Sequence, residues 1–321
     1  MAQPTGTYSA YQAKGLRENL TDVIYNIAPT ETPFVSNAGK GSATGVYHEW
    51  QTDTLAAPDG NNAAIEGDEA AGQASSPTNR LGNYCQIMRK QVTISGTLEA
   101  VNKAGRKNEL AYQMAKRGQE IKRDMETRAT GNYAAVIGND TTARQTAGFE
   151  AFIRTNVSRG TGGASGTLSG TTDGYPNAAA TDGTQRAFTE ALLKQVIQSV
   201  WTEGGDLKML MVGAGNKVAA SGFTGIATRF RDVPPGKQAQ IIGAADVYVS
   251  DFGELSIVPN RFQRNRTALL VDPDMVSIVT LRPFQTIPLA KTGDSEKRLM
   301  LVEWALKVHN EKAHGVIADL T

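Results

Sequence analysis

The sequence is poor in cysteine and histidine. Cys85 is the only cysteine among 321 residues, so no disulfide can form within the chain, which suits a reducing compartment. The three histidines are His48, His309 and His314. The last two stand five residues apart, a spacing that does not place both on one helical face, and no cysteine is near. We therefore expect surface or turn histidines and no metal site.

The chain also lacks an excess of either charge and any long apolar run. Its 33 Lys and Arg side chains against 32 Asp and Glu give a net charge of +1, which argues against a dedicated nucleic-acid binder but allows passive contact with nucleic acid. No apolar run approaches the roughly 20 residues of a membrane-spanning helix. The N-terminus lacks the charged start and apolar centre of a secretory signal. These absences predict a protein made in a cytoplasm that does not contact membranes.

Glycine, by contrast, is abundant, and it gathers in two polar tracts. The first covers residues 56–79 and the second residues 158–184, both rich in Gly, Ala, Ser, Thr and Asn. Each exceeds the roughly 12 to 15 residues expected of a connection inside a compact domain. We expect such segments to be disordered or to be ordered by contact with a partner.

Residues 1–42 have the pattern of an arm. A short amphipathic stretch around residues 20–27 is followed by Pro29 and Pro33, which stop a helix. So short a stretch cannot build a core alone. We expect the arm to lie on a neighbouring surface.

The first polar tract lies between two extended runs, residues 44–55 and 83–97. Together they predict a long two-stranded ribbon within residues 43–96. An isolated ribbon is marginally stable in water. We therefore expect it to pack on another subunit, with Trp50 exposed in a free monomer and buried in an assembly.

The longest helical pattern covers residues 97–130. Its apolar residues form one narrow stripe, made of Leu110, Met114, Ile121 and Met125. Lys, Arg, Asp and Glu crowd the other faces, and their mixed signs favour a solvated or intersubunit face over a nucleic-acid contact. Gly105 predicts a break in the first third, and Gly131 a stop. This pattern indicates a beam that lies on a sheet.

The second half predicts a compact α+β unit followed by strands. The predicted unit has a helix at 184–205, a buried strand at 207–214, a short helix at 215–223 and a hairpin at 245–262. The residues after Thr267 read mostly as strands, with a long strand at 299–308.

The hairpin contains the tripeptide Asp251-Phe252-Gly253, which is also the metal-holding signature of protein kinases. A kinase would need a His-Arg-Asp catalytic loop before it, and the only histidine upstream is His48. The tripeptide lies between two alternating runs, and glycine can take a positive φ at little cost. We therefore expect a hairpin corner, with positive φ at Gly253 and no metal or nucleotide.

Three other stretches resemble parts of catalytic sites. Asp272-Pro273-Asp274 pairs two acids, but the proline between them indicates a turn. The acidic cluster at 66–69 (Glu66, Asp68 and Glu69) lies in the first polar tract, where carboxylate geometry could not be held. The run "GAGNKVAASG" (213–222) follows a strand and opens a helix, yet lacks the Gly-Lys-Ser/Thr ending of a phosphate-binding loop. We expect no catalytic residue and no cofactor. A nucleotide-binding enzyme that uses Lys217 is kept as a minor alternative.

The order of these parts resembles the major capsid protein of tailed bacteriophages, with the Hong Kong 97-type fold. The motifs that carry the resemblance are "NIAPTETPF" (26–34), "VSDFGELSIVPNRF" (249–262), "LLVDPDMVSIVTLRPF" (269–284), "LAKTGDSEKRLMLVEWAL" (289–306) and "NEKAHGVI" (310–317). The first two hundred residues match by layout more than by letters. No cleavable N-terminal scaffolding segment is evident, and no residue can be matched to the Lys-to-Asn crosslink of the fold's namesake.

The resemblance implies an α+β fold with five regions. They are an N-terminal arm (1–42), an extended two-stranded E-loop (43–96), the spine helix with the first part of the peripheral (P) domain (97–160), the axial (A) domain with its preceding polar loop (161–262) and the returning P-domain β-sheet (263–321).

The resemblance also implies a function and partners. The expected function is a self-assembling subunit of an icosahedral phage head that encloses double-stranded DNA, built in the cytoplasm of a bacterial host. Expected partners are other copies in hexamers and pentamers, a portal, a separate scaffolding protein, a decoration or cement protein, and packaged DNA through non-specific contact. The alternative within the same fold is an encapsulin-like nanocompartment shell.

Overall fold

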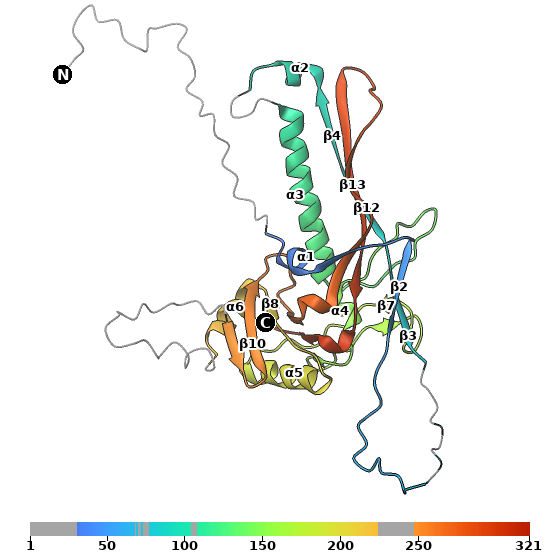
Figure 1. Cartoon of the computed structure of the whole chain (residues 1–321). Helices are drawn as coiled ribbons and strands as arrows, with labels where there is room; N and C mark the ends of the chain where they lie inside the picture. Colours follow the sequence, from blue (N-terminus) through green and yellow to red (C-terminus); the bar gives the residue numbers. More distant parts are fainter. Residues whose placement is uncertain (1–30, 68, 70–71, 73–76, 104–107, 224–246) are drawn as a thin grey trace, which may run out of the picture.

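The computed structural model describes residues 31–67, 69, 72, 77–103, 108–223 and 247–321 (Figure 1). The amphipathic stretch of the predicted arm and Gly105 lie outside the described residues. The helices are α1 (Pro33–Asn37), α2 (Gly96–Ala100), α3 (Glu109–Thr130), α4 (Phe149–Phe152), α5 (Glu190–Thr202) and α6 (Ala214–Ser221), with short 3-10 helices η2 (Pro273–Met275) and η3 (Glu311–Ala313).

The strands form two larger sheets and two small ones. In chain order they are β1 (Gly39–Ser42), β2 (Tyr47–Thr52), β3 (Asn79–Tyr84), β4 (Gln86–Ser95), β5 (Val157–Ser158), β6 (Thr167–Leu168), β7 (Pro176–Ala178), β8 (Met209–Val212), β9 (Val247–Ser250), β10 (Gly253–Pro259), β11 (Ala268–Val271), β12 (Val276–Pro288), β13 (Ser295–Val308) and β14 (Gly315–Ile317).

The first sheet is long and has the strand order β1-β12-β13-β4. Strands β12, β13 and β4 are antiparallel, and β1 joins β12 in parallel. Helix α3 lies along one face of this sheet, as the apolar stripe predicts (Figure 1). Ile121 and Met125 of the stripe are buried, and Leu110 and Met114 are half-buried.

The predicted helix at 97–130 is divided into α2 and α3. Residues 101–103 are not helical, and α3 begins at Glu109, where the Asn108 side chain accepts a hydrogen bond from the Ala111 N–H at 2.6 Å. The helix ends at Thr130, just before Gly131. The predicted stop is confirmed, and residues 101–103 interrupt the helix within its first third, as expected, before the Asn108 side-chain N-cap starts α3.

The predicted ribbon is wrong in its second strand. Strand β2 pairs with β3, from Tyr47 opposite Tyr84 to Thr52 opposite Asn79. Most of the run predicted to pair with β2 is β4, which instead pairs with β13 from Trp304 opposite Gln86 to Ser295 opposite Ser95. Alternating residues predict a strand, but every strand offers the same backbone donors and acceptors, so a local pattern does not identify the neighbour.

The second sheet has the strand order β5-β14-β11-β8-β10-β9. Its central strands are buried on both faces, which explains the continuous apolar run of β8. Met209 and Met211 of β8 join one hydrophobic core, and Leu210 and Val212 join another. Residues 263–321 therefore contribute to both sheets. Strands β11 and β14 lie in the six-stranded sheet, and β12 and β13 lie in the long sheet.

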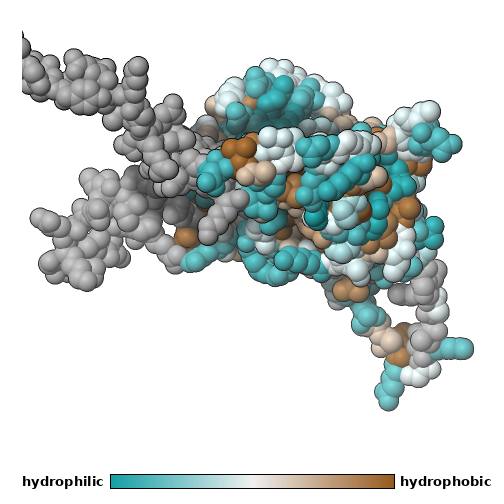
Figure 2. Space-filling model, turned by 90° about the horizontal axis from the view of Figure 1, so that it is seen from above, coloured by the Kyte–Doolittle hydropathy of each residue, from teal (hydrophilic) through white to brown (hydrophobic). Residues whose placement is uncertain are grey.

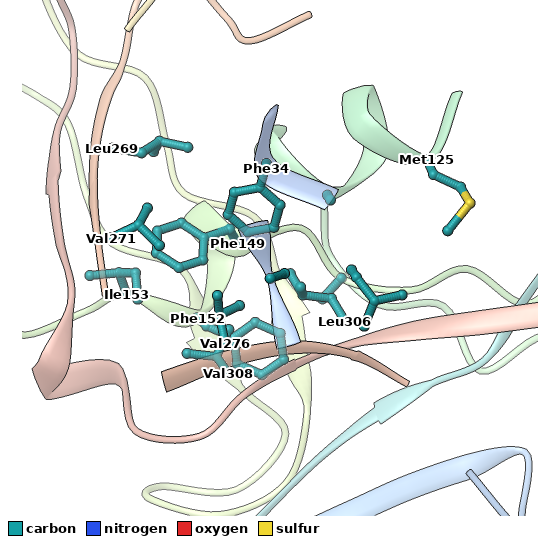
Figure 3. Packing of buried hydrophobic residues seen from close by; sticks show 14 of the residues in the cluster. Phe34, Met125, Phe149, Phe152, Ile153, Leu269, Val271, Val276, Leu306 and Val308 are labelled. Carbon is teal, nitrogen blue, oxygen red and sulfur yellow. The ribbon is translucent and has the colours of Figure 1, made fainter. Parts of the chain in front are cut away.

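The main core lies where α3, α4 and both sheets meet. Figure 3 shows aromatic rings from α1 and α4 packed against aliphatic side chains of β11, β12 and β13. Phe34 and Phe149 meet edge to face, with ring centroids 5.5 Å apart. The second core lies between α5 and the opposite face of the six-stranded sheet and includes Leu193, Val196 and Ile197.

Candidate functional site

The Asp251-Phe252-Gly253 tripeptide forms the turn between β9 and β10. Gly253 pairs with Ser250 and has a φ of 144°. The Ser250 hydroxyl accepts a hydrogen bond from the Phe252 N–H at 3.2 Å and donates one to the Gly253 carbonyl at 2.9 Å. These contacts confirm the hairpin corner.

The "GAGNKVAASG" run is the start of α6, which follows β8 directly. The Lys217 ammonium donates to the Ile257 carbonyl at 3.3 Å, and the Asn216 amide donates to the Asn265 carbonyl at 2.7 Å. Both side chains thus hold α6 against neighbouring segments of the same chain. The arrangement accounts for the run without a phosphate.

The paired acids of the Asp272-Pro273-Asp274 sequence form a turn, as expected. The Asp272 carboxylate accepts a hydrogen bond from the Asp274 N–H at 3.1 Å, and Lys208 forms ion pairs with both acids. In the acidic cluster, Glu66 and Glu69 are exposed, and Asp68 lies outside the described residues. Across the part of the chain that the structure describes, no group of three or more His, Cys, Asp and Glu side chains could hold a metal ion. None of the described helices is long and apolar enough to cross a membrane.

The prediction of a surface position is wrong for His314. Its side chain is fully buried beside Phe149, with ring centroids 5.0 Å apart. Nδ1 accepts the Asp272 N–H at 3.2 Å, and Nε2 lies 3.2 Å from the Met275 carbonyl, so a neutral ring protonated on Nε2 satisfies both contacts. Burial lowers the pKa of His314 to about 4. The residue is a neutral core histidine, because the β11–β12 turn folds over it.

The prediction for Trp50 is also wrong. Its side chain is only 8% exposed within the single subunit. The indole packs on Phe152 of α4, with ring centroids 5.9 Å apart, and the Lys307 ammonium lies 5.9 Å from its ring centroid. The β2–β3 ribbon thus packs on the core of its own subunit, and Trp50 contributes to folding.

Three tyrosines fix the other side of this ribbon base. Tyr47 and Tyr84 lie 4.7 Å apart between ring centroids, and Tyr175 meets both rings edge on. The Tyr47 ring covers Gly82, where a Cβ would lie 2.4 Å from it. Burial and the nearby Glu49 carboxylate raise the pKa of Tyr47 to about 12. The base of the ribbon is therefore rigid.

The segment between β2 and β3, residues 53–78, is here called the extension, and its described residues 53–67 project from this packed base (Figure 1). It contains five acidic residues and no Lys, Arg or His. Two large apolar side chains on it face solvent, Leu55 at 99% and Ile65 at 80% exposure. Neither side chain is covered within the single subunit, so both are available to another molecule.

A second candidate surface is the face of the long sheet opposite α3. Met300 and Lys90 are paired and face α3, since Lys90 forms an ion pair with Asp124 at 2.9 Å. Neighbouring residues of both strands must then face away. This α3-free face consists of Ile87, Arg89, Gln91, Thr93, Lys297, Leu299, Leu301 and Glu303.

The α3-free face is basic and partly apolar. The buried Glu303 carboxylate lies between Arg144 and Arg282, with a 2.7 Å contact to each. Together with Arg89 and Lys297, four basic side chains therefore oppose one acidic side chain. Ile87 is 45% exposed. The sequence does not reveal this face, because its residues come from four separate segments that only folding brings together.

A smaller apolar patch lies at the far end of the six-stranded sheet. Trp201 of α5 and Phe252 of the hairpin turn lie 5.1 Å apart between ring centroids and are both exposed. On the face seen from above, Figure 2 shows hydrophobic residues scattered over a largely hydrophilic surface. The chain thus offers several exposed contact surfaces.

Comparison with known proteins gives these surfaces a context. The sequence model of the family described as SU10 major capsid protein matches residues 3–321. The major capsid protein of Escherichia phage Phieco32 is 29% identical over 352 aligned residues, which cover 99% of this chain and 97% of that protein.

Solved structures show the same fold at low sequence identity. A capsid chain of Cyanophage A-1(L) has a TM-score of 0.65 at 12% identity and is covered to 98%, as is this chain. The SrpI encapsulin of Synechococcus elongatus PCC 7942 has a TM-score of 0.55 at 11% identity, over 97% of this chain and 93% of that one. The encapsulin likeness shows the fold alone, whereas the family match distinguishes a phage capsid from a nanocompartment. The chain belongs to the SU10 major capsid protein family, has the Hong Kong 97-type fold, and is a structural subunit of a tailed-phage head rather than an enzyme.

Proposed function

We propose that the subunits assemble into the hexamers and pentamers of a closed shell through contact between the extension of one copy and the α3-free face of a neighbouring copy. The observation that carries this proposal is the match between the two surfaces. The extension is purely acidic with exposed Leu55 and Ile65, and the sheet face is basic with exposed Ile87.

We place the contact between two copies, because the described part of the extension points away from the sheet face of its own subunit. In Figure 1 the extension and the free end of the long sheet point in opposite directions from the body. A contact that one copy gives and the next receives is heterologous, and rotation of such contacts closes rings.

The two kinds of side chain have different roles in this contact. Burial of an exposed Leu or Ile side chain stabilises a contact by about 1.5–3 kcal/mol, whereas an exposed ion pair contributes only about 0–1 kcal/mol. Leu55 and Ile65 therefore supply most of the affinity. The acids and bases select the orientation and reject like-charged faces.

The remaining partners follow from the role of a head protein. The proposal includes a portal, a separate scaffolding protein, a decoration or cement protein, and non-specific contact with packaged double-stranded DNA, with assembly in the cytoplasm of a bacterial host. The near-neutral net charge of +1 supports contact with DNA that does not grip it. The N-terminal arm, E-loop, P-domain and A-domain boundaries given above remain part of this proposal.

Charge reversal with rescue tests the contact. The extension variant carries Asp53→Lys, Asp59→Lys and Glu66→Lys, and the face variant carries Arg89→Glu and Lys297→Glu. We expect each variant to give few shells in negative-stain images, because like charges then face each other. A chain that carries all five changes should regain shells. The control is Lys116→Glu with Lys122→Glu, two exposed sites on α3.

The outcomes separate the pairing from assembly itself. Shells of normal yield from both single-surface variants would disprove the pairing while leaving shell formation intact. Loss of shells in the control as well would mean that any charge change on the subunit prevents assembly, which also contradicts the specific contact. Melting temperatures within a few degrees of the unchanged chain exclude misfolding as the cause.

A further inference from the structure

The buried carboxylate of Glu126 joins three segments that are far apart in the sequence. Glu126 lies in the last turns of α3 and is fully buried. Its Oε1 accepts hydrogen bonds from the Phe34 N–H at 2.8 Å and from the Asn260 amide at 2.6 Å, and its Oε2 accepts one from the Val35 N–H at 2.9 Å. The same side chain thus holds the start of α1, the spine helix α3 and the end of β10.

This carboxylate depends on N–H donors for its stability. No ion pair of Glu126 with a Lys, Arg or His is present among the described residues, whereas the buried Glu150 and Glu303 each face two arginines. Burial raises the pKa of Glu126, and the N–H groups of Val35, Phe34 and Asn260 oppose that rise. A buried charge without a counter-ion is costly unless all its hydrogen bonds are made.

The segment held in this way is the continuation of the arm. Residues 31–38, here the arm-end segment, have no other side-chain cap for α1, because the preceding Thr32 makes no capping bond. Glu126 supplies that cap from 92 residues away. The Phe34 ring then packs on Phe149 in the main core (Figure 3).

Asn260 links Glu126 to the six-stranded sheet. Its N–H donates to the Val212 carbonyl at 2.8 Å at the end of β8, and its side-chain oxygen accepts the Phe262 N–H at 2.9 Å. Asn260 is 2% exposed, so its bond to Glu126 is shielded from solvent. A displacement of the β8–β10 edge relative to α3 therefore removes its bond to Glu126.

We infer that Glu126 couples the docking of the arm-end segment to the position of the six-stranded sheet, so that loss of the Asn260 contact loosens α1 and loss of the α1 contacts loosens the segment after β10. The physical reason is that three donors share one uncompensated charge. When one donor leaves, the charge is better stabilised by water than by the remaining two, which weakens both. Such coupling is reciprocal by thermodynamic necessity. In a shell, contacts made by the six-stranded sheet would then alter how firmly each arm is held.

Hydrogen exchange of the full-length chain, read by mass spectrometry, tests the coupling. We expect Asn260→Ala to raise the exchange rate of the Phe34 and Val35 amides by about tenfold, in the range of typical couplings, although Asn260 forms no hydrogen bond with either residue. The matched control is Asn216→Ala, since Asn216 is also 2% exposed and the change also removes a buried amide donor, here one that bonds the Asn265 carbonyl. The control should leave the exchange of residues 31–38 unchanged.

Two further variants complete the test. Glu126→Gln keeps one acceptor oxygen but turns an NH₂ group toward a donor, so exchange of the arm-end segment should rise without any change at Asn260. Val35→Pro removes one N–H from the first turn of α1, where proline is tolerated, and should speed exchange of the Phe262 amide. Unchanged exchange at Phe34 and Val35 in Asn260→Ala would overturn the inference. If that variant does not fold, unchanged exchange at Phe262 in Val35→Pro overturns it instead.

Discussion

The two polar tracts are both dominated by small and polar residues but have different structures. The described residues of the first tract, 56–67, 69, 72 and 77–79, are almost all exposed and form no strand before Asn79. The second tract, 158–184, carries strands β6 and β7 and a bridge between Ala164 and Thr181. The expectation that it needs a partner to become ordered is wrong.

The difference lies in the groups that accept hydrogen bonds from the backbone N–H groups. In the second tract, the Asp319 carboxylate accepts the Gly160 N–H at 3.0 Å and the Gly183 N–H at 2.7 Å, and so closes both ends of the loop. The middle is held by Gly174, whose N–H donates to the Arg80 carbonyl at 2.8 Å. The first tract has no comparable buried acceptor among its described residues. A glycine-rich loop therefore folds where the rest of the chain supplies acceptors and remains available to partners where it does not.

Removal of the shared acceptor should have the largest effect. Asp319→Ala leaves two N–H groups and the Arg266 guanidinium, which lies 2.9 Å from the carboxylate, without their partner. We expect the free energy of unfolding to fall by about 3–5 kcal/mol, the usual cost of breaking a buried charged network. Chemical denaturation measures it, with Asp140→Ala at an exposed turn as control. A loss below 1 kcal/mol would show that the tract folds without this anchor.

A smaller loss is expected where the second tract meets the ribbon base. Gly174 has a φ of 92°, and a Cβ there would lie 2.0 Å from the Ser169 hydroxyl oxygen. Gly174→Ala should cost roughly 1–3 kcal/mol and speed hydrogen exchange in β3. Gly162→Ala is the matched control, because Gly162 has a φ of 81° but an open surrounding, so only backbone strain remains. Equal costs at both sites would contradict the packing argument.

Low pH should weaken the Asp319 anchor of the second tract, which has no counterpart in the described residues of the first. Burial alone would raise the pKa of Asp319, but the N–H groups of Gly160 and Gly183 and the Arg266 guanidinium lower it below its usual value. A depressed folded-state pKa gives stability that is fully present above the unfolded value near 3.9 and is lost as pH falls through the folded pKa. The loss amounts to about 1.4 kcal/mol per unit of depression.

The comparison of the unchanged chain with Asp319→Asn isolates this contribution. The melting temperature of the unchanged chain should fall more steeply below pH 3.9 than that of the variant. The low pKa of His314, about 4, makes the fold less stable as pH falls from 6.5 toward 4, but it does so in both proteins and cancels. Parallel acid limbs would assign no role to the Asp319 charge.

The sequence predicts elements better than it predicts their partners. The apolar stripe of α3, the strand at β8 and the turn at Gly253 follow from local periodicity and glycine chemistry, and the structure confirms each. The neighbour of β4 is not a local property, so the predicted ribbon was half wrong.

Burial within the subunit is the second part that local reasoning misses. Trp50 is covered by Phe152, about 100 positions away in the sequence. His314 is covered by the turn from Asp272 to Met275, about 40 positions away. The α3-free face and the Glu126 contacts have the same origin, because each combines segments that meet only after folding. Charge counting along residues 53–78 could have identified the acidic extension, and that was the one usable signal for the site.

The smallest effect on stability is expected in the extension. Substitutions there should nevertheless have a large effect on assembly. Leu55→Ser with Ile65→Ser changes two side chains that are 99% and 80% exposed. Surface changes of this kind usually alter the free energy of unfolding by no more than about 0.5 kcal/mol. The same changes remove most of the apolar area that the extension offers to a neighbour, so shell yield in negative-stain images should fall severalfold. The matched pair is Val101→Ser with Val218→Ser, also exposed but away from the extension, which should leave shell yield unchanged. A drop of several kcal/mol in stability would mean that the extension folds against its own subunit, as the second tract does, and the contrast between the two tracts would disappear.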